Sequence, residues 1–261
     1  MLSRINVGQY IPSESSLHLL DPRTKIIATL VILALIVVAA YPYKLLILGL
    51  FICSLMLISY IPLHIYIYAL RPFLLIIIIT AALQLIMLKG DILVTILGVN
   101  ITSYGINMAI AISLRLVMII ILIRILMATT TPSSLMGGLE KLLKPFSSIG
   151  LPVEELIMIM TISLRFIPLF IEEATRLQQA QISRGINFKS LTIIQRIKSI
   201  STLLIPLFRM SFTRALDIST AMETRCYNGG EGRTYLYVFK WGKADYFSLL
   251  GLLIITILIL L

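Results

Sequence analysis

Five long runs of apolar residues constrain this chain more than any other feature of its sequence. A bilayer core about 30 Å thick needs roughly 20 apolar helical residues, because hydrocarbon offers backbone groups no hydrogen-bond partner. We interpret five runs as spans, at residues 26–41, 45–61, 73–88, 106–129 and 244–261. Proline follows the first two, and the pair Arg71-Pro72 is expected to break the chain before the third. The runs predict an all-α integral membrane protein with about five transmembrane helices.

The remaining apolar stretch, residues 92–101, is too short and too rich in glycine and asparagine to span. Composition agrees with a membrane protein, since 59% of residues are hydrophobic and only 13% are charged. This balance excludes an ordinary soluble enzyme. Eleven of the 22 basic residues, but only three acidic ones, lie between residues 176 and 243. Apolar residues interleave this basic segment, which favours a helix beside the membrane over a nucleic-acid-binding surface.

Basic residues also predict the orientation, because they are retained on the cytoplasmic side. One set of loops holds Arg4, Arg23, Lys25, Arg71, Lys141 and Lys144, whereas the alternate loops hold only Lys44 and Lys89. We therefore expect a cytoplasmic N-terminus and an external C-terminus. The predicted domains are a four-span membrane domain at 1–129, a cytoplasmic or interfacial polar domain at 130–243, and a last transmembrane helix at 244–261.

The polar domain is expected to contain one short amphipathic helix and two long helices, which we expect to cross. The short one starts at Thr131-Pro132 and stops at Lys144-Pro145. The first long helix opens after Pro152 and ends near Gly185, a suitable C-cap. The second repeats its pattern: Ile-Pro-Leu-Phe at 167–170 recurs at 205–208, and Thr-Arg at 175–176 recurs at 213–214. The offset of 38 fits either a structural duplication or a chance match of short motifs.

Four segments carry a resemblance to a known family. They are Leu-Asp-Pro-Arg-Thr-Lys at 20–25, the stretch at 131–145, Ser183-Arg184-Gly185, and Thr224-Arg225-Cys226. Together they resemble the transmembrane T component, or scaffold subunit, of energy-coupling factor transporters, which import vitamins and transition-metal ions. In that family an Ala-Arg-Gly type of tripeptide ends each of two long coupling helices. Here Ser183, Thr224 and Cys226 depart from the pattern. Because the second tripeptide has no glycine, we expect Gly229 and Gly230 to end the second long helix.

The resemblance implies a non-catalytic subunit of a prokaryotic plasma-membrane importer. Two ATP-binding cassette ATPase subunits would receive the helix ends in grooves, with Arg184 and Arg225 pairing with acidic residues. ATP and Mg²⁺ would be bound by those partners, with no cofactor in this chain, and a small membrane S component would bind the substrate. The residues alone also allow a plainer reading, in which each arginine complements a helix C-terminus or binds anionic lipid.

Two arginines fall inside the fourth run. Arg115 lies at mid-span, where a charged residue is a functional candidate by default, and we expect it to face the helix bundle or a substrate-binding subunit. Simple packing is the alternative for Arg115. Arg124 lies nearer the inner end, from which its side chain can extend to the interface.

Other activities lack their motifs. The chain has no G-x-x-x-x-G-K-[ST] loop for ATP and no H-E-x-x-H pair, and its two cysteines, Cys53 and Cys226, predict neither a disulfide nor a metal site. His18 and His64 are isolated and are expected at the membrane interface. A self-sufficient channel or secondary carrier is the alternative function, although acidic residues avoid the middles of the apolar runs. A membrane enzyme is a third, and it lacks a catalytic constellation.

Overall fold

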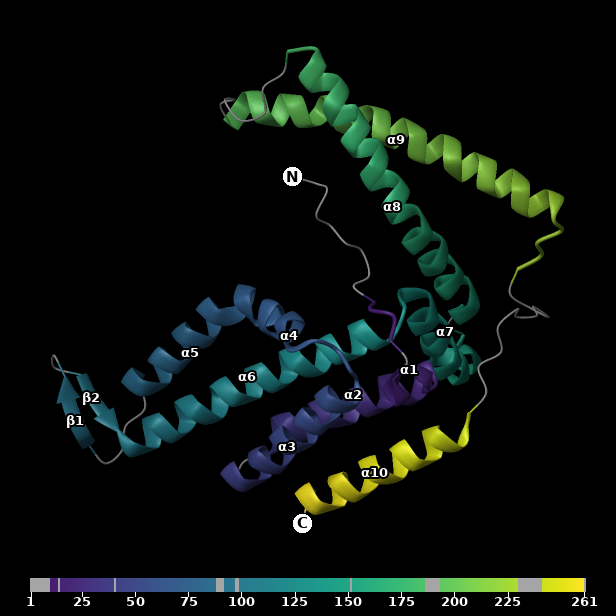
Figure 1. Ribbon diagram of the computed structural model, residues 1–261. Coiled ribbons are helices and arrows are strands. Elements are labelled where there is room, and N and C mark those ends of the chain that lie inside the picture. The colour runs from purple at the N-terminus through teal and green to yellow at the C-terminus, as the bar shows by residue number, and fades with distance from the viewer. Residues whose placement is uncertain are drawn as a thin grey trace. The chain divides into compact units, whose positions relative to one another are not determined.

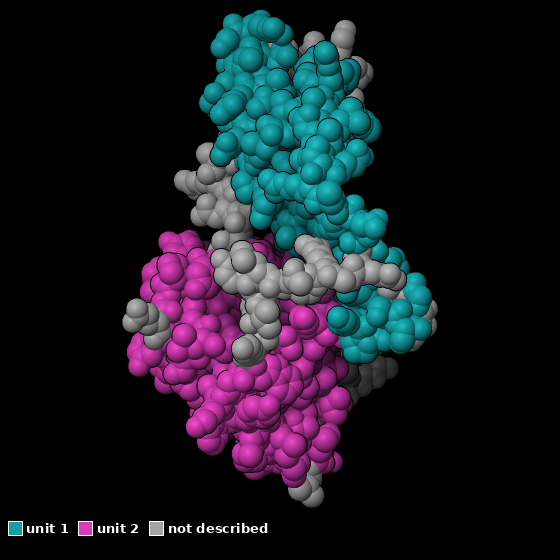
Figure 2. All heavy atoms as spheres, turned by 90° about the vertical axis from the view of Figure 1, so that its right-hand side faces the viewer, with its two compact units in different colours: residues 1–7, 143–237 teal, residues 8–142, 238–261 magenta. Residues whose placement is uncertain are grey.

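The computed structural model describes residues 10–13, 15–39, 41–87, 92–96, 99–150, 152–185, 193–229 and 241–260. Arg4, Lys89 and Gly230, which the sequence analysis used, lie outside these ranges. The chain divides into two compact units, shown in different colours in Figure 2: residues 8–142 with 238–261, and residues 1–7 with 143–237.

Unit 2, magenta in Figure 2, holds the apolar helices (Figure 1). Its elements are α1 (Ser16–Leu19), α2 (Pro22–Val38), α3 (Pro42–Ile58), α4 (Leu63–Leu70), the 3-10 turn η2 (Arg71–Phe73), α5 (Leu74–Met87), β1 (Ile92–Ile96), β2 (Val99–Thr102), α6 (Ser103–Thr129), α7 (Pro132–Leu143) and α10 (Lys243–Leu260). Helices α2, α3, α6 and α10 share one apolar core, in which Ile36, Leu48, Ala128 and Leu252 are buried. The all-α class is confirmed, with one small hairpin as its exception.

Proline positions explain several helix starts in this unit. Pro22 and Pro42 each occupy the first turn of a helix, where the missing N–H has no intrahelical partner in any case. Pro72 likewise lies in the first turn of a helical segment, so the Arg71-Pro72 pair does not end the helical stretch. It forms η2, which joins α4 to α5, and the amide of Leu74 donates to the carbonyl of Arg71. The predicted break was therefore wrong, and the helical stretch begins ten residues before Phe73.

Three helical stretches in the described part of the chain are long and apolar enough to cross a membrane. They are Leu63–Met87, Ser103–Thr129 and Lys243–Leu260. Helices α2 and α3 have 17 residues each, or about 25 Å of helix, so their crossing stays a prediction. Within the stretch 92–101, predicted not to span, the strands β1 and β2 are antiparallel, and Ile96 pairs with Val99.

Unit 1, teal in Figure 2, contains η3 (Lys144–Ile149) and the two long helices α8 (Val153–Ser183) and α9 (Ile193–Thr224). Figure 1 shows α8 and α9 crossing. Glu154 lies in the first turn of α8, where it suits the helix dipole, and its Oε1 is 3.9 Å from Nζ of Lys144. Pro168 and Pro206 lie inside these helices, which continue on both sides.

The two compact units are a different division from the predicted domains 1–129, 130–243 and 244–261, which stay a prediction. The short helix α7 lies almost entirely in the unit of the apolar helices, whose limit falls between residues 142 and 143. The reason is local packing. Gly138 of α7 lies against the start of α2, and Thr130, which follows α6 directly, is buried.

Candidate functional site

The two arginine tripeptides have the same place at the ends of their helices. Ser183 is the last residue of α8, Arg184 is its C-cap, and Gly185 has a left-handed φ of 90°. The amide of Gly185 donates to the carbonyl of Ile182 over 2.9 Å. This geometry turns the chain sharply away from the helix, and glycine adopts it without steric cost. The helix was predicted to end near Gly185, and this is confirmed, with Gly185 at the position after the C-cap, called C′.

The second helix ends in the same way, although it lacks the glycine. Thr224 is the last residue of α9, and Cys226 has a left-handed φ of 55°. The amide of Cys226 donates to Glu223 O over 2.9 Å, and that of Tyr227 donates to Met222 O over 3.0 Å. These two bonds form a Schellman motif, which satisfies carbonyls that the helix leaves open.

Cysteine thus takes the conformation that the motif normally gives to glycine. The expectation that Gly229 and Gly230 supply this helix end was wrong for Gly229, which has a φ of 84° but follows the turn. Gly230 lies outside the described residues.

The residues around each arginine leave its side chain free to bind a partner. Ser183 Oγ donates to Gln179 O over 3.1 Å, and Thr224 Oγ1 donates to Ala221 O over 3.0 Å, so both hydroxyls are used within their own helices. Arg184 and Arg225 are exposed, and neither forms an ion pair with any residue that the structure describes. Each helix C-terminus therefore presents a planar cation that can bind a carboxylate with two parallel hydrogen bonds.

A groove between α8 and α9 lies close to the second tripeptide. Its volume is about 430 Å³, and its lining residues are Ile162, Ala215, Ile218, Ser219, Met222, Glu223 and Tyr227. Ile162 comes from α8, whereas the others come from the last turns of α9 and the residues just after it. This groove was not predicted. The spacing of Ala215, Ile218 and Met222 on one helix face was the available signal.

The Leu-Asp-Pro-Arg-Thr-Lys segment forms the start of α2. Asp21 is the N-cap, and its Oδ1 accepts a hydrogen bond of 2.9 Å from the amide of Arg23. The amide of Asp21 in turn donates to Oδ1 of Asp245, also over 2.9 Å. Four residues on, Lys25 Nζ donates to Thr129 O over 2.9 Å and to His18 O over 3.2 Å. This segment therefore gathers the starts of α2 and α10 and the end of α6.

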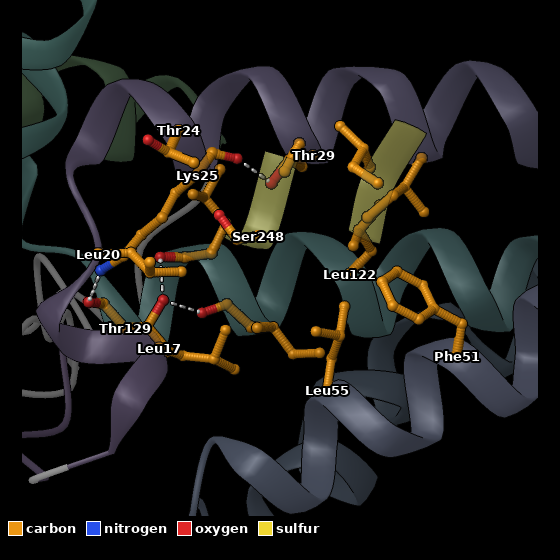
Figure 3. Close-up of a pocket in the computed structure, with 15 residues that line it drawn as sticks. Leu17, Leu20, Thr24, Lys25, Thr29, Phe51, Leu55, Leu122, Thr129 and Ser248 are labelled. Carbon is orange, nitrogen blue, oxygen red and sulfur yellow. Dashed lines mark hydrogen bonds between the residues drawn. The ribbon is translucent and has the colours of Figure 1, made fainter. Parts of the chain in front are cut away.

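Lys25 also lines a small cavity between α2, α3, α6 and α10, which Figure 3 shows together with Thr129 and Ser248. The cavity has a volume of about 90 Å³. Beside it, His18 is held by Ser15, whose Oγ is 2.6 Å from Nδ1, and by the carbonyl of Ile11, 3.0 Å from Nε2. Burial lowers the pKa of His18. The neutral ring, accepting from Ser15 and donating to Ile11, fits these contacts.

Arg115 faces the bundle. Its Nη2 donates to the carbonyl of Ala39, which is the C-cap of α2 and is buried. A cation at this place satisfies an open carbonyl and complements the negative end of the helix dipole. No group of three His, Cys, Asp or Glu side chains that could hold a metal ion occurs among the described residues.

Comparisons with known proteins show the family of this chain. A family model described as CbiQ, cobalt transport protein, matches residues 13–236. The energy-coupling factor transporter transmembrane protein EcfT of Acidaminococcus fermentans is 41% identical over 261 residues, which cover 100% of this chain and 97% of the relative.

Proteins of the same name from other organisms are similar to this chain over nearly their whole length. That of Thermosediminibacter oceani is 41% identical over 94% of this chain and 92% of its own length, and that of Bacillus subtilis is 36% identical over 99% and 98%. The chain therefore belongs to the CbiQ family and, with these relatives, to the transmembrane T components of energy-coupling factor transporters.

Proposed function

We propose that this membrane subunit couples two ATP-binding cassette ATPase subunits to a separate S component that binds the substrate. Arg184 and Arg225 dock into the ATPases, which bind ATP and Mg²⁺ and carry out hydrolysis. When ATP draws the ATPases together, the two helix ends follow, and α8 and α9 change their crossing angle. That motion shifts the S component between orientations, in the manner of hinge or shear transmission.

The matched helix ends are the observation that carries this proposal. Two crossing helices of about 31 residues present exposed arginines at the same C-cap position, followed by the same left-handed turn. A plain dipole interaction is worth about 0.3–1 kcal/mol and needs no such match. The backbone turn places each guanidinium at the tip of its helix, where a groove on a partner can receive it.

The proposal includes a location and a substrate class. The N-terminus, α8 and α9 face the cytoplasm of a prokaryotic cell, and the C-terminus faces outward, as the distribution of basic residues favours. The transported substrate is a vitamin or a transition-metal ion. The cobalt transport description of the family model supports the metal, whereas the printed names of the relatives give no substrate.

Co-purification tests the proposal directly. The full chain, tagged in its native membrane and purified in mild detergent, should retain one or two kinds of ATPase subunit and a small hydrophobic protein. Reversing both charges with Arg184→Glu and Arg225→Glu should release the ATPases and abolish ATP-dependent uptake. If the doubly reversed chain kept its ATPases and its uptake, docking through these arginines would be wrong.

The repeat supplies a matched control. Arg176 and Arg214 occupy equivalent positions in the two copies, are exposed, and lie about two and three turns before the helix ends. Arg176→Glu with Arg214→Glu reverses the same number of charges in the same helices and should leave the ATPases bound. Loss of binding in this control as well would indicate that general charge, and not the helix tips, holds the complex.

A further inference from the structure

The last helix, α10, is held to the α2–α3 hairpin by a polar contact at each of its ends. At its start, the Asp245 carboxylate is 97% buried and accepts two hydrogen bonds. Oδ2 accepts from the amide of Gly242 over 2.8 Å, and Oδ1 accepts from the amide of Asp21 over 2.9 Å. The first bond caps α10 itself, in the manner of a capping box. The second joins α10 to the N-cap of α2.

The other end of α10 is held by a lysine. Lys44, in the first turn of α3, donates from Nζ to the carbonyl of Ile259 over 2.6 Å. That carbonyl lies in the last turn of α10, where it has no intrahelical partner. The ammonium also lies 5.8 Å and 5.9 Å from the ring centroids of Tyr41 and Tyr43. Asp245 and Ile259 are fourteen residues apart, or about 21 Å along the helix.

Between these two contacts α10 meets the hairpin through apolar side chains. Leu252 is buried in the core with Ile32 and Leu35 of α2. In a bilayer such contacts give little net attraction, because lipid tails are as apolar as leucine. A polar contact is directional, and a hydrogen bond between membrane helices contributes about 0.6–2 kcal/mol. The two polar contacts are therefore the specific attachment of α10.

We infer that Asp245 and Lys44 are positioning residues that fix α10 to the α2–α3 hairpin, so that the last helix moves as one body with the helix start at residues 20–25. Lys25 supplies the balancing positive charge, because its ammonium interacts electrostatically with both Asp21 and Asp245. The transport consequence rests on the proposed coupling function. The attachment itself does not, and it can be measured without any partner.

A natural probe reports on the start of α10. Trp241 is the single tryptophan of the chain, it precedes Gly242 directly, and its ring centroid lies 5.7 Å from that of Tyr246. We would place the full chain in phosphatidylcholine nanodiscs and measure Trp241 anisotropy and quenching by acrylamide. Asp245→Ala leaves two amides without an acceptor. The fraction of molecules in which the start of α10 is detached from α2 should rise about tenfold or more for each lost bond. Anisotropy should fall and quenching should rise.

Four further variants sharpen this test. Asp245→Asn should give an intermediate signal, because its one oxygen replaces only one of two acceptors. Ser248→Ala should match the wild type, since Ser248 Oγ donates to Asp245 O within α10 itself. Lys44→Met should speed amide exchange in the last turn of α10, and Lys44→Arg should restore protection. Wild-type signals from Asp245→Asn together with unchanged exchange in Lys44→Met would overturn the inference.

Transport is the second readout. In a complex reconstituted with ATPases and S component, Asp245→Asn should lower uptake per ATP hydrolysed while the ATPases stay bound. Absence of ATP-dependent uptake in the wild-type complex would refute the proposed function and leave the Trp241 result standing. Changed Trp241 signals with unchanged uptake per ATP would overturn the transport consequence alone.

Discussion

Gly138 of α7 lies so close to Pro22 of α2 that a Cβ placed on this glycine would be 2.9 Å from Cβ of the proline. The carbonyl carbon of Pro22 and the amide of Arg23 would be 3.2 Å and 3.3 Å away. Two of these three neighbours are backbone atoms, which cannot turn aside. The contact thus brings together the two segments of the resemblance that precede the long helices.

Gly138→Ala should therefore destabilise the protein. Overpacking of this kind costs about 1–3 kcal/mol, which exceeds the helix propensity of about 1 kcal/mol that alanine gains over glycine. Thermal unfolding of the full chain in detergent would show a lower midpoint. Gly251→Ala in α10 is the matched control, because a Cβ there meets nothing within 4 Å. Equal midpoints for the two variants would contradict the close packing.

The two helix ends should respond in opposite directions to exchange of their C′ residues. Cys226→Gly relieves a left-handed conformation that costs a non-glycine residue about 1–2 kcal/mol, so the last turn of α9 should be better protected. Gly185→Ala introduces the same cost at a φ of 90° and should loosen the end of α8. Hydrogen exchange of peptides covering each end measures both, and changes of the same sign would refute the shared geometry.

How much the sequence predicts differs between local and distant features. The ends of α8 and the class of fold follow from local chemistry, because apolar runs, prolines and glycines act within a few residues. The Asp21–Asp245 bond joins residues 224 apart, and no periodicity in the sequence indicates such a pair. The effect of Pro72 was misjudged for another reason. A proline in the first turn of a new helical segment interrupts no hydrogen bond, so its presence does not tell whether the helix ends there or continues.

Lysine should not replace arginine at the helix tips. If each guanidinium binds a carboxylate through two hydrogen bonds, Arg184→Lys and Arg225→Lys lose one charge-assisted bond each, or about 1.5–3 kcal/mol. We expect the affinity for the ATPase subunits to fall about tenfold or more at each site. The matched pair Arg176→Lys and Arg214→Lys should bind normally. Unchanged affinity in the first pair would support the plainer reading, in which any cation at the helix end suffices.

Arg115 offers a test between packing and subunit contact. Arg115→Met removes the donor to the buried Ala39 carbonyl at the end of α2. Stability should fall by about 1.5–3 kcal/mol, the range for a hydrogen bond to a charged group, while the S component should still co-purify. Denaturation of the purified chain and a pull-down separate the two effects. Normal stability with loss of the S component would instead identify Arg115 as a subunit contact.

Stability should fall as the pH drops below about 6.5, because of His18. Burial, aided by the charge of Lys25, lowers the pKa of this residue below its ordinary value of 6.5. Between the lowered pKa and 6.5 the unfolded chain therefore binds more protons than the folded one, so stability rises with pH in that window. His18→Gln should flatten this part of the profile, whereas His64→Gln, in an exposed residue of α4, should preserve it. Unfolding midpoints of the three proteins between about pH 5 and 8 measure the difference, and a wild-type profile in His18→Gln would assign the titration to another group.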